Sequence, residues 1–374
     1  MPTSAPLVSA PAATLVGRRP AVGADRLIAD LVPPPRFDQV RFSSYVPNPA
    51  EHSQAVARDR LEAFAATVGA PQKKGGGLFK KKAAAPSAGG VYLDGGFGVG
   101  KTHLLASLWH EAPAPREKKA YGTFVEYTSL VGALGFATAV ERLADFALVC
   151  IDEFELDDPG DTVLVSTLLT RLSDRGVKLA ATSNTLPDKL GEGRFAAADF
   201  LREIQALSSR FDVIRVDGPD YRHRDLPTPP APVAEDAVRR TVDERAAATL
   251  DTFDDLAEEL AAVHPSRYGA LIDGVSAVGV TGVRPLDDQN VALRLVVLID
   301  RLYDRKVPVV ASGTPLGELF TPELLRGGYR KKYLRAVSRI TALARDGVAL
   351  AEAEAEMEAE AEAHADSVAV PAAL

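Results

Sequence analysis

Cysteine is nearly absent from this chain of 374 residues. The one cysteine, Cys150, lies in an apolar run and cannot form a disulfide within the chain, which predicts a reducing compartment. Long apolar runs are also missing, because no stretch approaches the roughly 18 residues that a membrane-spanning helix needs. The N-terminus lacks the basic segment and apolar core of a secretion signal. We therefore expect a soluble protein.

The sequence has no excess of basic residues. Lysine and arginine together number 43, and aspartate and glutamate 51, so the formal net charge is -8. This balance argues against a protein whose main task is to coat nucleic acid, although it is compatible with local basic patches. Hydrophobic residues make up 46% of the chain, enough for a substantial core, and the length predicts more than one domain.

Two segments of unusual composition precede the first clear motif. Residues 1–35 are rich in proline and alanine and predict a flexible arm with a short helix near 25–31; the prolines argue against the alternative, an organelle transit peptide. Residues 36–88 contain a predicted helix at about 50–66 and a cationic, glycine-rich insert at 73–82. The insert is either a solvated linker or a contact for an acidic partner, lipid headgroups or nucleic acid.

The most informative motif is a complete G-x-x-x-x-G-K-[ST] phosphate loop that follows a short apolar strand. Its glycines let backbone N–H groups turn toward phosphates, Lys101 can reach the β and γ phosphates, and the Thr102 hydroxyl can ligate Mg²⁺. The helix predicted at 103–110 points its positive end at the anion. The expected nucleotide-binding residues are Gly95, Gly96, Phe97, Gly98, Val99, Gly100, Lys101, Thr102 and His103.

Polar residues end two further predicted strands. Asp152 and Glu153 close the apolar run 147–152, so we expect Asp152 to hold Mg²⁺ together with Thr102 and Glu153 to polarise the attacking water. The next strand ends in a polar triplet whose last member, Asn184, is a candidate to orient that water or contact the γ phosphate. The alternative for Asn184 is a residue that only starts a turn.

Strand and helix patterns alternate from residue 89 to residue 225. This alternation predicts an α/β nucleotide-binding core, with a parallel sheet covered by helices on both faces and the nucleotide at the carboxyl ends of the strands. The predicted strands are 91–94, 123–127, 147–152, 177–182 and 212–216.

The region 226–350 begins rich in proline and becomes helical and charged. Within it, 286–311 matches 156–181 at a constant offset, with about ten of 26 positions identical, as a repeated helix and strand would. By that offset Gly282 and Val283 stand where the first copy has Asp152 and Glu153, so the second copy lacks the two carboxylates. The alternative is that the match arises from chance and shared helix composition. The acidic Glu/Ala tail at 351–374 predicts a frayed helix or a disordered segment.

Taken together, these segments resemble the ZapE family of bacterial cell-division ATPases, which has mitochondrial relatives and belongs to the AAA+ superfamily. The Leu-Ile-Asp-x-Leu-Tyr-Asp and Asp-Tyr-Arg segments are more specific to the family than the phosphate loop. Where the family is expected to have a segment containing His-Phe-His, after the first helix, this chain has residues 121–130. The resemblance is carried by Gly95 to Thr102, Cys150 to Phe154, Thr182 to Asn184, Val216 to Arg222, Leu298 to Asp304, Ser338 and Arg339.

The resemblance implies an AAA+ core followed by a C-terminal region with a helical lid. It also implies an arginine that reaches into a neighbouring subunit's site, for which Arg210 is the first candidate and Arg194 and Arg202 are competitors. Arg339 lies on a helix of the expected lid and is a candidate to contact the nucleotide.

The function that the resemblance implies is Mg²⁺-dependent ATP hydrolysis that regulates or remodels a protein assembly, with a partner in the division apparatus. It implies a cytoplasmic homo-oligomer, dependent on nucleotide, that is recruited to the division site or the inner face of the membrane. Two alternatives stay open: a nucleotide-switched adaptor and a helicase-loader-like ATPase. The acidic charge weighs against nucleic acid as a partner.

Overall fold

The computed structural model describes residues 13–20, 23–69, 89–96, 98–154, 159–186, 205, 208–219 and 229–368. The chain divides into two compact units: residues 22–225, here the P-loop unit, and residues 1–21 with 226–374, here the C-terminal unit. Among the residues described, no helix is both long and apolar enough to cross a bilayer.

The P-loop unit contains a five-stranded sheet in the order β2-β3-β4-β1-β5, and every neighbouring pair is parallel. The phosphate-loop strand β1 therefore lies between β4 and β5. The predicted parallel α/β sheet is confirmed. The strands are β1 (Gly90–Gly95), β2 (Lys119–Thr123), β3 (Leu148–Asp152), β4 (Lys178–Ser183) and β5 (Phe211–Val216).

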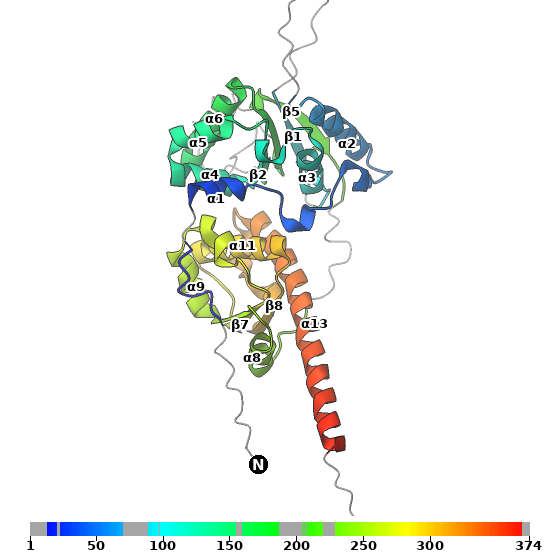
Figure 1. Ribbon diagram of the computed structural model, residues 1–374, viewed down its shortest axis with the longest axis vertical. Coiled ribbons are helices and arrows are strands. Elements are labelled where there is room, and N and C mark those ends of the chain that lie inside the picture. Colours follow the sequence, from blue (N-terminus) through cyan, green and yellow to red (C-terminus); the bar gives the residue numbers. More distant parts are fainter. Residues whose placement is uncertain are drawn as a thin grey trace, which may run out of the picture. The chain divides into compact units, whose positions relative to one another are not determined.

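Helices cover both faces of this sheet (Figure 1). Successive residues of β1 point to opposite faces: Tyr92 packs with α4, α5 and α6, whereas Val91 and Leu93 pack with α2 and α3. The helices are α1 (Ala24–Ala29), α2 (His52–Ala65), α3 (Lys101–Glu111), α4 (Phe124–Leu134), α5 (Phe136–Ala144) and α6 (Pro159–Asp174), with 3₁₀ turns at Pro35–Phe37, Phe42–Ser44 and Arg116–Lys118.

The strand predicted at 123–127 is wrong. Thr123 caps α4, because its hydroxyl accepts the N–H of Glu126 at 3.4 Å while the Glu126 carboxylate accepts the N–H of Thr123 at 2.6 Å. The strand lies just before this cap, at 119–123, and four of its five residues are buried. Its sequence, Lys-Ala-Tyr-Gly-Thr, carries a weak strand signal because lysine, alanine and glycine are all poor strand formers.

The C-terminal unit contains a parallel sheet of its own, β6-β7-β8. From the sequence we expected one helix and strand here, the repeat at 286–311, but no sheet. Where a linker and a helical lid were expected, strands alternate with helices. The strands are β6 (Thr249–Thr252), β7 (Val278–Val283) and β8 (Val309–Gly313). The helices are α8 (Glu235–Asp243), α9 (Phe253–Ala262), α10 (Tyr268–Leu271), α11 (Gln289–Arg305), α12 (Pro322–Arg326) and α13 (Arg330–Val368), with 3₁₀ turns at Pro265–Arg267 and Leu316–Glu318.

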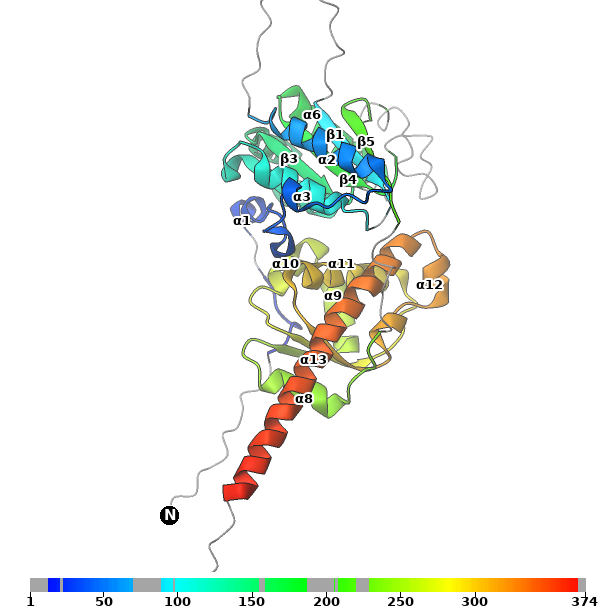
Figure 2. The ribbon, with the colours of Figure 1, turned by 90° about the vertical axis from the view of Figure 1, so that its right-hand side faces the viewer.

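Most of the predicted acidic tail belongs to α13, which continues unbroken to Val368. Figure 2 shows the end of this helix running past α8 and away from the rest of the unit. Alanine and glutamate are strong helix formers, and this propensity outweighs the repulsion between glutamates four residues apart.

Strands and helices follow one another in the same way in the two units. Thr123 and Thr252, at the ends of β2 and β6, both cap the following helix, and their partners on the next strand are Asp152 and Thr281. Asp152 therefore corresponds to Thr281, one residue before the position that the sequence offset indicates. The described part of the second copy nevertheless lacks the carboxylate, as expected.

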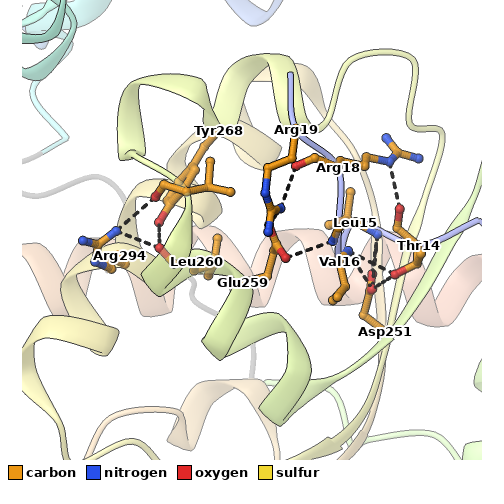
Figure 3. Close-up of polar contacts among 12 residues, drawn as sticks. Thr14, Leu15, Val16, Arg18, Arg19, Asp251, Glu259, Leu260, Tyr268 and Arg294 are labelled. Carbon is orange, nitrogen blue, oxygen red and sulfur yellow. Dashed lines mark hydrogen bonds and ion pairs between the residues drawn. The ribbon is translucent and has the colours of Figure 1, made fainter. Parts of the chain in front are cut away.

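The free edge of β6 is covered by residues 13–19, here the N-terminal strap (Figure 3). The N–H of Leu250 donates to the carbonyl of Ala13 at 2.8 Å, and the side chain of Leu15 is fully buried. Backbone N–H groups of the strap donate to two buried carboxylates, Asp251 and Glu259. The flexible arm predicted for residues 1–35 is therefore wrong for residues 13–20.

The other edge of the three-stranded sheet is covered by α13. A Cβ on Gly347 would lie 2.1 Å from the carbonyl oxygen of Val309, so the helix backbone touches the strand backbone.

We predict that Gly347→Ala destabilises the C-terminal unit by about 1–3 kcal/mol, because neither backbone can yield without moving its element. Gly132→Ala is the control: Gly132 lies in α4, where nothing is within 4 Å of an added Cβ, and alanine should stabilise that helix by about 0.5–1 kcal/mol. Urea unfolding of both variants measures the effects, and equal stability of the two would contradict the contact.

Candidate nucleotide site

The phosphate loop joins β1 to the N-terminus of α3. A Cβ on Gly95 would lie 2.1 Å from the carbonyl oxygen of Val216, so only glycine allows β5 to approach this closely. Gly98 and Gly100 adopt positive φ angles of 74° and 89°, which glycine tolerates and which turn the loop into the first turn of α3. The described glycines of the loop therefore have the close packing and the positive φ angles that favour glycine at these positions.

The ammonium group of Lys101 lies inside this loop. It donates to the carbonyl oxygens of Gly95 at 2.9 Å and Gly96 at 2.6 Å, and to Oδ1 of Asn184 at 2.9 Å. Asn184 follows β4, the neighbour of β1, so the parallel register brings the end of that strand to the loop. The structure thus places Asn184 in direct contact with the phosphate-loop lysine.

Asp152 lies at the end of β3 and accepts hydrogen bonds on both carboxylate oxygens. The hydroxyl of Thr102 donates to Oδ1 at 3.3 Å, and the hydroxyl of Thr182 donates to the same oxygen. The hydroxyl of Tyr121 donates to Oδ2 at 2.9 Å. The side chain is only 7% exposed, so these donors replace the water that a carboxylate of this kind would otherwise bind.

Glu153 follows directly and has an unusual backbone. Its φ angle is +53°, in the left-handed region that a residue with a side chain seldom adopts. Its N–H donates at 3.1 Å both to Oδ1 of Asp152 and to the hydroxyl of Thr182, which holds the turn in place. The residue is only partly buried.

These residues fit a nucleoside triphosphate with Mg²⁺. The Lys101 ammonium is bound by neutral oxygen acceptors, for which phosphate oxygens are stronger substitutes. Thr102 and Asp152 offer a hydroxyl and a carboxylate 3.3 Å apart, and Mg²⁺ prefers such oxygen ligands completed by phosphates and water.

The segment before α2 supports the loop from outside the motif. The hydroxyl of Tyr45 donates to the carbonyl of Val99 at 2.9 Å, and a Cβ on Gly100 would lie 2.5 Å from the Tyr45 ring. His103 contacts the same segment: its Nε2 lies 3.0 Å from Oγ of Ser44 and its ring packs against Tyr45 edge-on. Burial lowers the pKa of His103, although a bond to the Arg41 carbonyl opposes this shift.

Arg210 lies away from this cluster. It directly precedes β5. The first residue of β5 pairs with Gly90 at the start of β1 and its last residue pairs with Gly95, so Arg210 lies at the amino ends of the strands, opposite the end that carries the loop. There it bonds to Asp174 at 3.0 Å. Phe97, Arg194 and Arg202 lie outside the described residues.

Arg339 belongs to the C-terminal unit. Its guanidinium is 2.5 Å from Oδ1 of Asp300 and lies over the ring of Tyr303. A second guanidinium, that of Arg335, donates to Oδ2 of Asp300 at 2.7 Å. Although burial opposes it, the two guanidinium groups lower the pKa of Asp300. The Leu-Ile-Asp-x-Leu-Tyr-Asp segment and Arg339, noted separately in the sequence, thus meet in the core of this unit.

Sequence reasoning missed Tyr45, Tyr121 and Thr182 as parts of the site. Tyr121 was noted only because it differs from the expected family segment, and Thr182 only as part of a polar triplet. Tyr45 precedes the loop by about fifty positions and has no motif around it. Strand ends that meet at one edge of a parallel sheet are the signal that connects Tyr121 and Thr182 to Asp152.

Comparison with known proteins gives several matches. Cell division protein ZapE of Escherichia coli strain K12 is 35% identical over 146 residues, which cover 37% of this chain and 39% of ZapE. Lactation elevated protein 1 homolog B of Danio rerio is 24% identical over 294 residues, covering 64% of this chain and 58% of that protein. The matched regions thus span less than two thirds of either relative.

Among solved structures, the replication initiator DnaA bound to AMPPCP and single-stranded DNA has a TM-score of 0.37 at 12% identity, covering 89% of this chain and 95% of that one. The family model described as AFG1-like ATPase matches residues 21–239 and 229–351. The expected relation to ZapE and its relatives is confirmed, and this chain belongs to the AFG1-like ATPase family.

Proposed function

We propose that this chain is a Mg²⁺-dependent ATP hydrolase that regulates or remodels a protein assembly. The observation that carries the proposal is the contact between Thr102 and Asp152, with the strained Glu153 directly beside them. A turn with a purely structural role could use glycine at this left-handed backbone position and would need no carboxylate beside the phosphate loop. Activation of water does need a carboxylate at this place.

Each residue of the cluster has a separate role in this reaction. The loop amides and Lys101 bind the phosphates and neutralise charge that develops on them. Thr102 and Asp152 would hold Mg²⁺, which supplies further charge neutralisation when bound. Glu153 accepts a proton from the attacking water, and Asn184, now bonded to Lys101, is placed to orient that water or contact the terminal phosphate.

Adenine is the base that we propose. The sequence has no Asn-Lys-x-Asp segment of the kind that recognises guanine. The family to which the chain belongs is described as ATPases, and this description supports the same choice.

Turnover in this proposal depends on assembly. Arg210 cannot serve the site of its own chain, because it lies at the other edge of the sheet. It is therefore proposed to act in the site of a second copy, which requires a nucleotide-dependent homo-oligomer. Arg339 is bound to Asp300 and Tyr303 within its own unit, and we do not retain it as a nucleotide contact.

The partner that we propose is a protein of the division apparatus. The support is the similarity to a protein named cell division protein ZapE. The proposal places the chain in the cytoplasm, with peripheral recruitment to the division site or the inner face of the membrane.

Replacing Glu153 with glutamine should lower the ATP turnover number roughly 100-fold or more while leaving ATP affinity within about twofold, because the amide cannot accept the proton. Steady-state phosphate release and equilibrium binding of a fluorescent ATP analogue measure the two quantities. Glu141→Gln is the control, since Glu141 is an exposed carboxylate of α5 paired with Arg175, and it should behave like the unsubstituted chain. Full turnover in Glu153→Gln would remove Glu153 as the proposed base, and no turnover in the unsubstituted chain would remove the hydrolase proposal. Full biological activity without turnover would favour the nucleotide-switched adaptor.

The backbone of Glu153 leads to a second expectation. Glycine and alanine at this position both remove the carboxylate, but only glycine adopts φ +53° without steric cost. Glu153→Gly should therefore be more stable than Glu153→Ala by about 1 kcal/mol, measured by urea unfolding. An alanine variant as stable as the glycine variant would show that the backbone here carries no strain.

A further inference from the structure

The hydrogen bond from Tyr121 to Asp152 belongs to no known element of the phosphate-loop motif. The phenol donates to Oδ2 at 2.9 Å from β2, the strand next to β3, and the side chain is 2% exposed. We propose that Tyr121 is a positioning residue that holds the Asp152 carboxylate in the orientation that binds Mg²⁺. This inference rests on the proposed function.

The two carboxylate oxygens of Asp152 have different surroundings. Oδ1 receives the hydroxyls of Thr102 and Thr182 and the N–H of Glu153, so it faces the proposed metal site. Oδ2 accepts a hydrogen bond from the phenol of Tyr121, which belongs to the neighbouring strand β2. A turn of the carboxylate plane away from this orientation would move both oxygens out of line with their donors and break the bond to Tyr121. The phenol therefore holds the plane in which one carboxylate oxygen is directed toward Thr102.

Tyr121 is itself held rigidly. Its N–H donates to the carbonyl of Leu31 at 2.8 Å, and its ring belongs to the core between the sheet and helices α2 and α3. The neighbouring Gly122 has no room for a side chain, because a Cβ there would lie 2.8 Å from Cδ2 of Leu31. Because the phenol is fixed in this way, it cannot move with the carboxylate when the carboxylate turns. The hydrogen bond therefore resists rotation of the carboxylate.

The C-terminal unit offers an internal comparison. Leu250 occupies the place of Tyr121: it lies two residues before the capping threonine, and its N–H donates to a chain segment that covers the strand edge. In the same unit Thr281 occupies the place of Asp152. The phenol is thus absent where the carboxylate is absent, although the backbone arrangement is the same. A residue needed only to build the strand would have no reason to follow the carboxylate.

The test compares Tyr121→Phe with Tyr127→Phe in the full chain. Tyr127 is the matched control: it is equally buried and donates to the same strand at 3.0 Å, but to the carbonyl of Cys150 and not to the carboxylate. Two quantities are measured, the Mg²⁺ concentration for half-maximal ATP hydrolysis and the affinity for a fluorescent ATP analogue with Mg²⁺ and with EDTA. Removing a hydrogen-bond donor to a metal-binding group typically lowers the metal affinity 10- to 100-fold.

For Tyr121→Phe we expect a rise of about 10-fold in the half-maximal Mg²⁺ concentration, with affinity in EDTA unchanged. Tyr127→Phe should lose comparable stability but leave the Mg²⁺ dependence within twofold. Equal Mg²⁺ dependence in the two variants would overturn the role of Tyr121 while leaving the hydrolase proposal intact. If Mg²⁺ affects neither hydrolysis nor nucleotide affinity in the unsubstituted chain, the proposed function itself fails, and the positioning role fails with it.

Discussion

The site depends on the position of β1 between β4 and β5 in a parallel sheet. This order brings the carboxyl ends of β1, β3 and β4 to one edge, where the phosphate loop, Asp152 and Asn184 meet. Side chains alternate along each strand, so a shift of one residue in register would turn Asp152 away from Thr102 and direct apolar neighbours to the loop. The helices on both faces hold this register by burying the alternating residues of β1, β2, β3 and β4.

Within this edge, Asp152 is the residue to which the other groups are connected. Thr102 belongs to the loop, Tyr121 to β2 and Thr182 to β4, and all three donate to its carboxylate. Thr182 also binds the N–H of Glu153, so the strained turn that places the proposed base depends on the same cluster. A nearly buried charge with donors from three elements links the metal site to the packing of the sheet.

The sequence indicated the residues that meet at this edge better than the architecture around them. Loop, lysine and paired carboxylates are adjacent along the chain, so a motif reveals them, and the strands near them are apolar enough to recognise. β2 and β6 escaped because neither carries a run of β-branched residues, whereas β7 was missed although Val278, Val280 and Val283 favour a strand. The N-terminal strap escaped because its order comes from carboxylates at Asp251 and Glu259, more than 230 positions away. Tyr121 could be connected to Asp152 only once the register of β2 and β3 was known.

We propose that one site of the P-loop unit binds ATP together with Mg²⁺. Titration calorimetry on the folded full chain tests this proposal most directly, with ATP added in the presence of Mg²⁺ or EDTA and with Lys101→Met as the comparison. We expect one ATP per chain, bound more tightly with Mg²⁺, and loss of that binding in Lys101→Met. Absence of binding by the folded unsubstituted chain, or binding that persists unchanged in Lys101→Met, would contradict it.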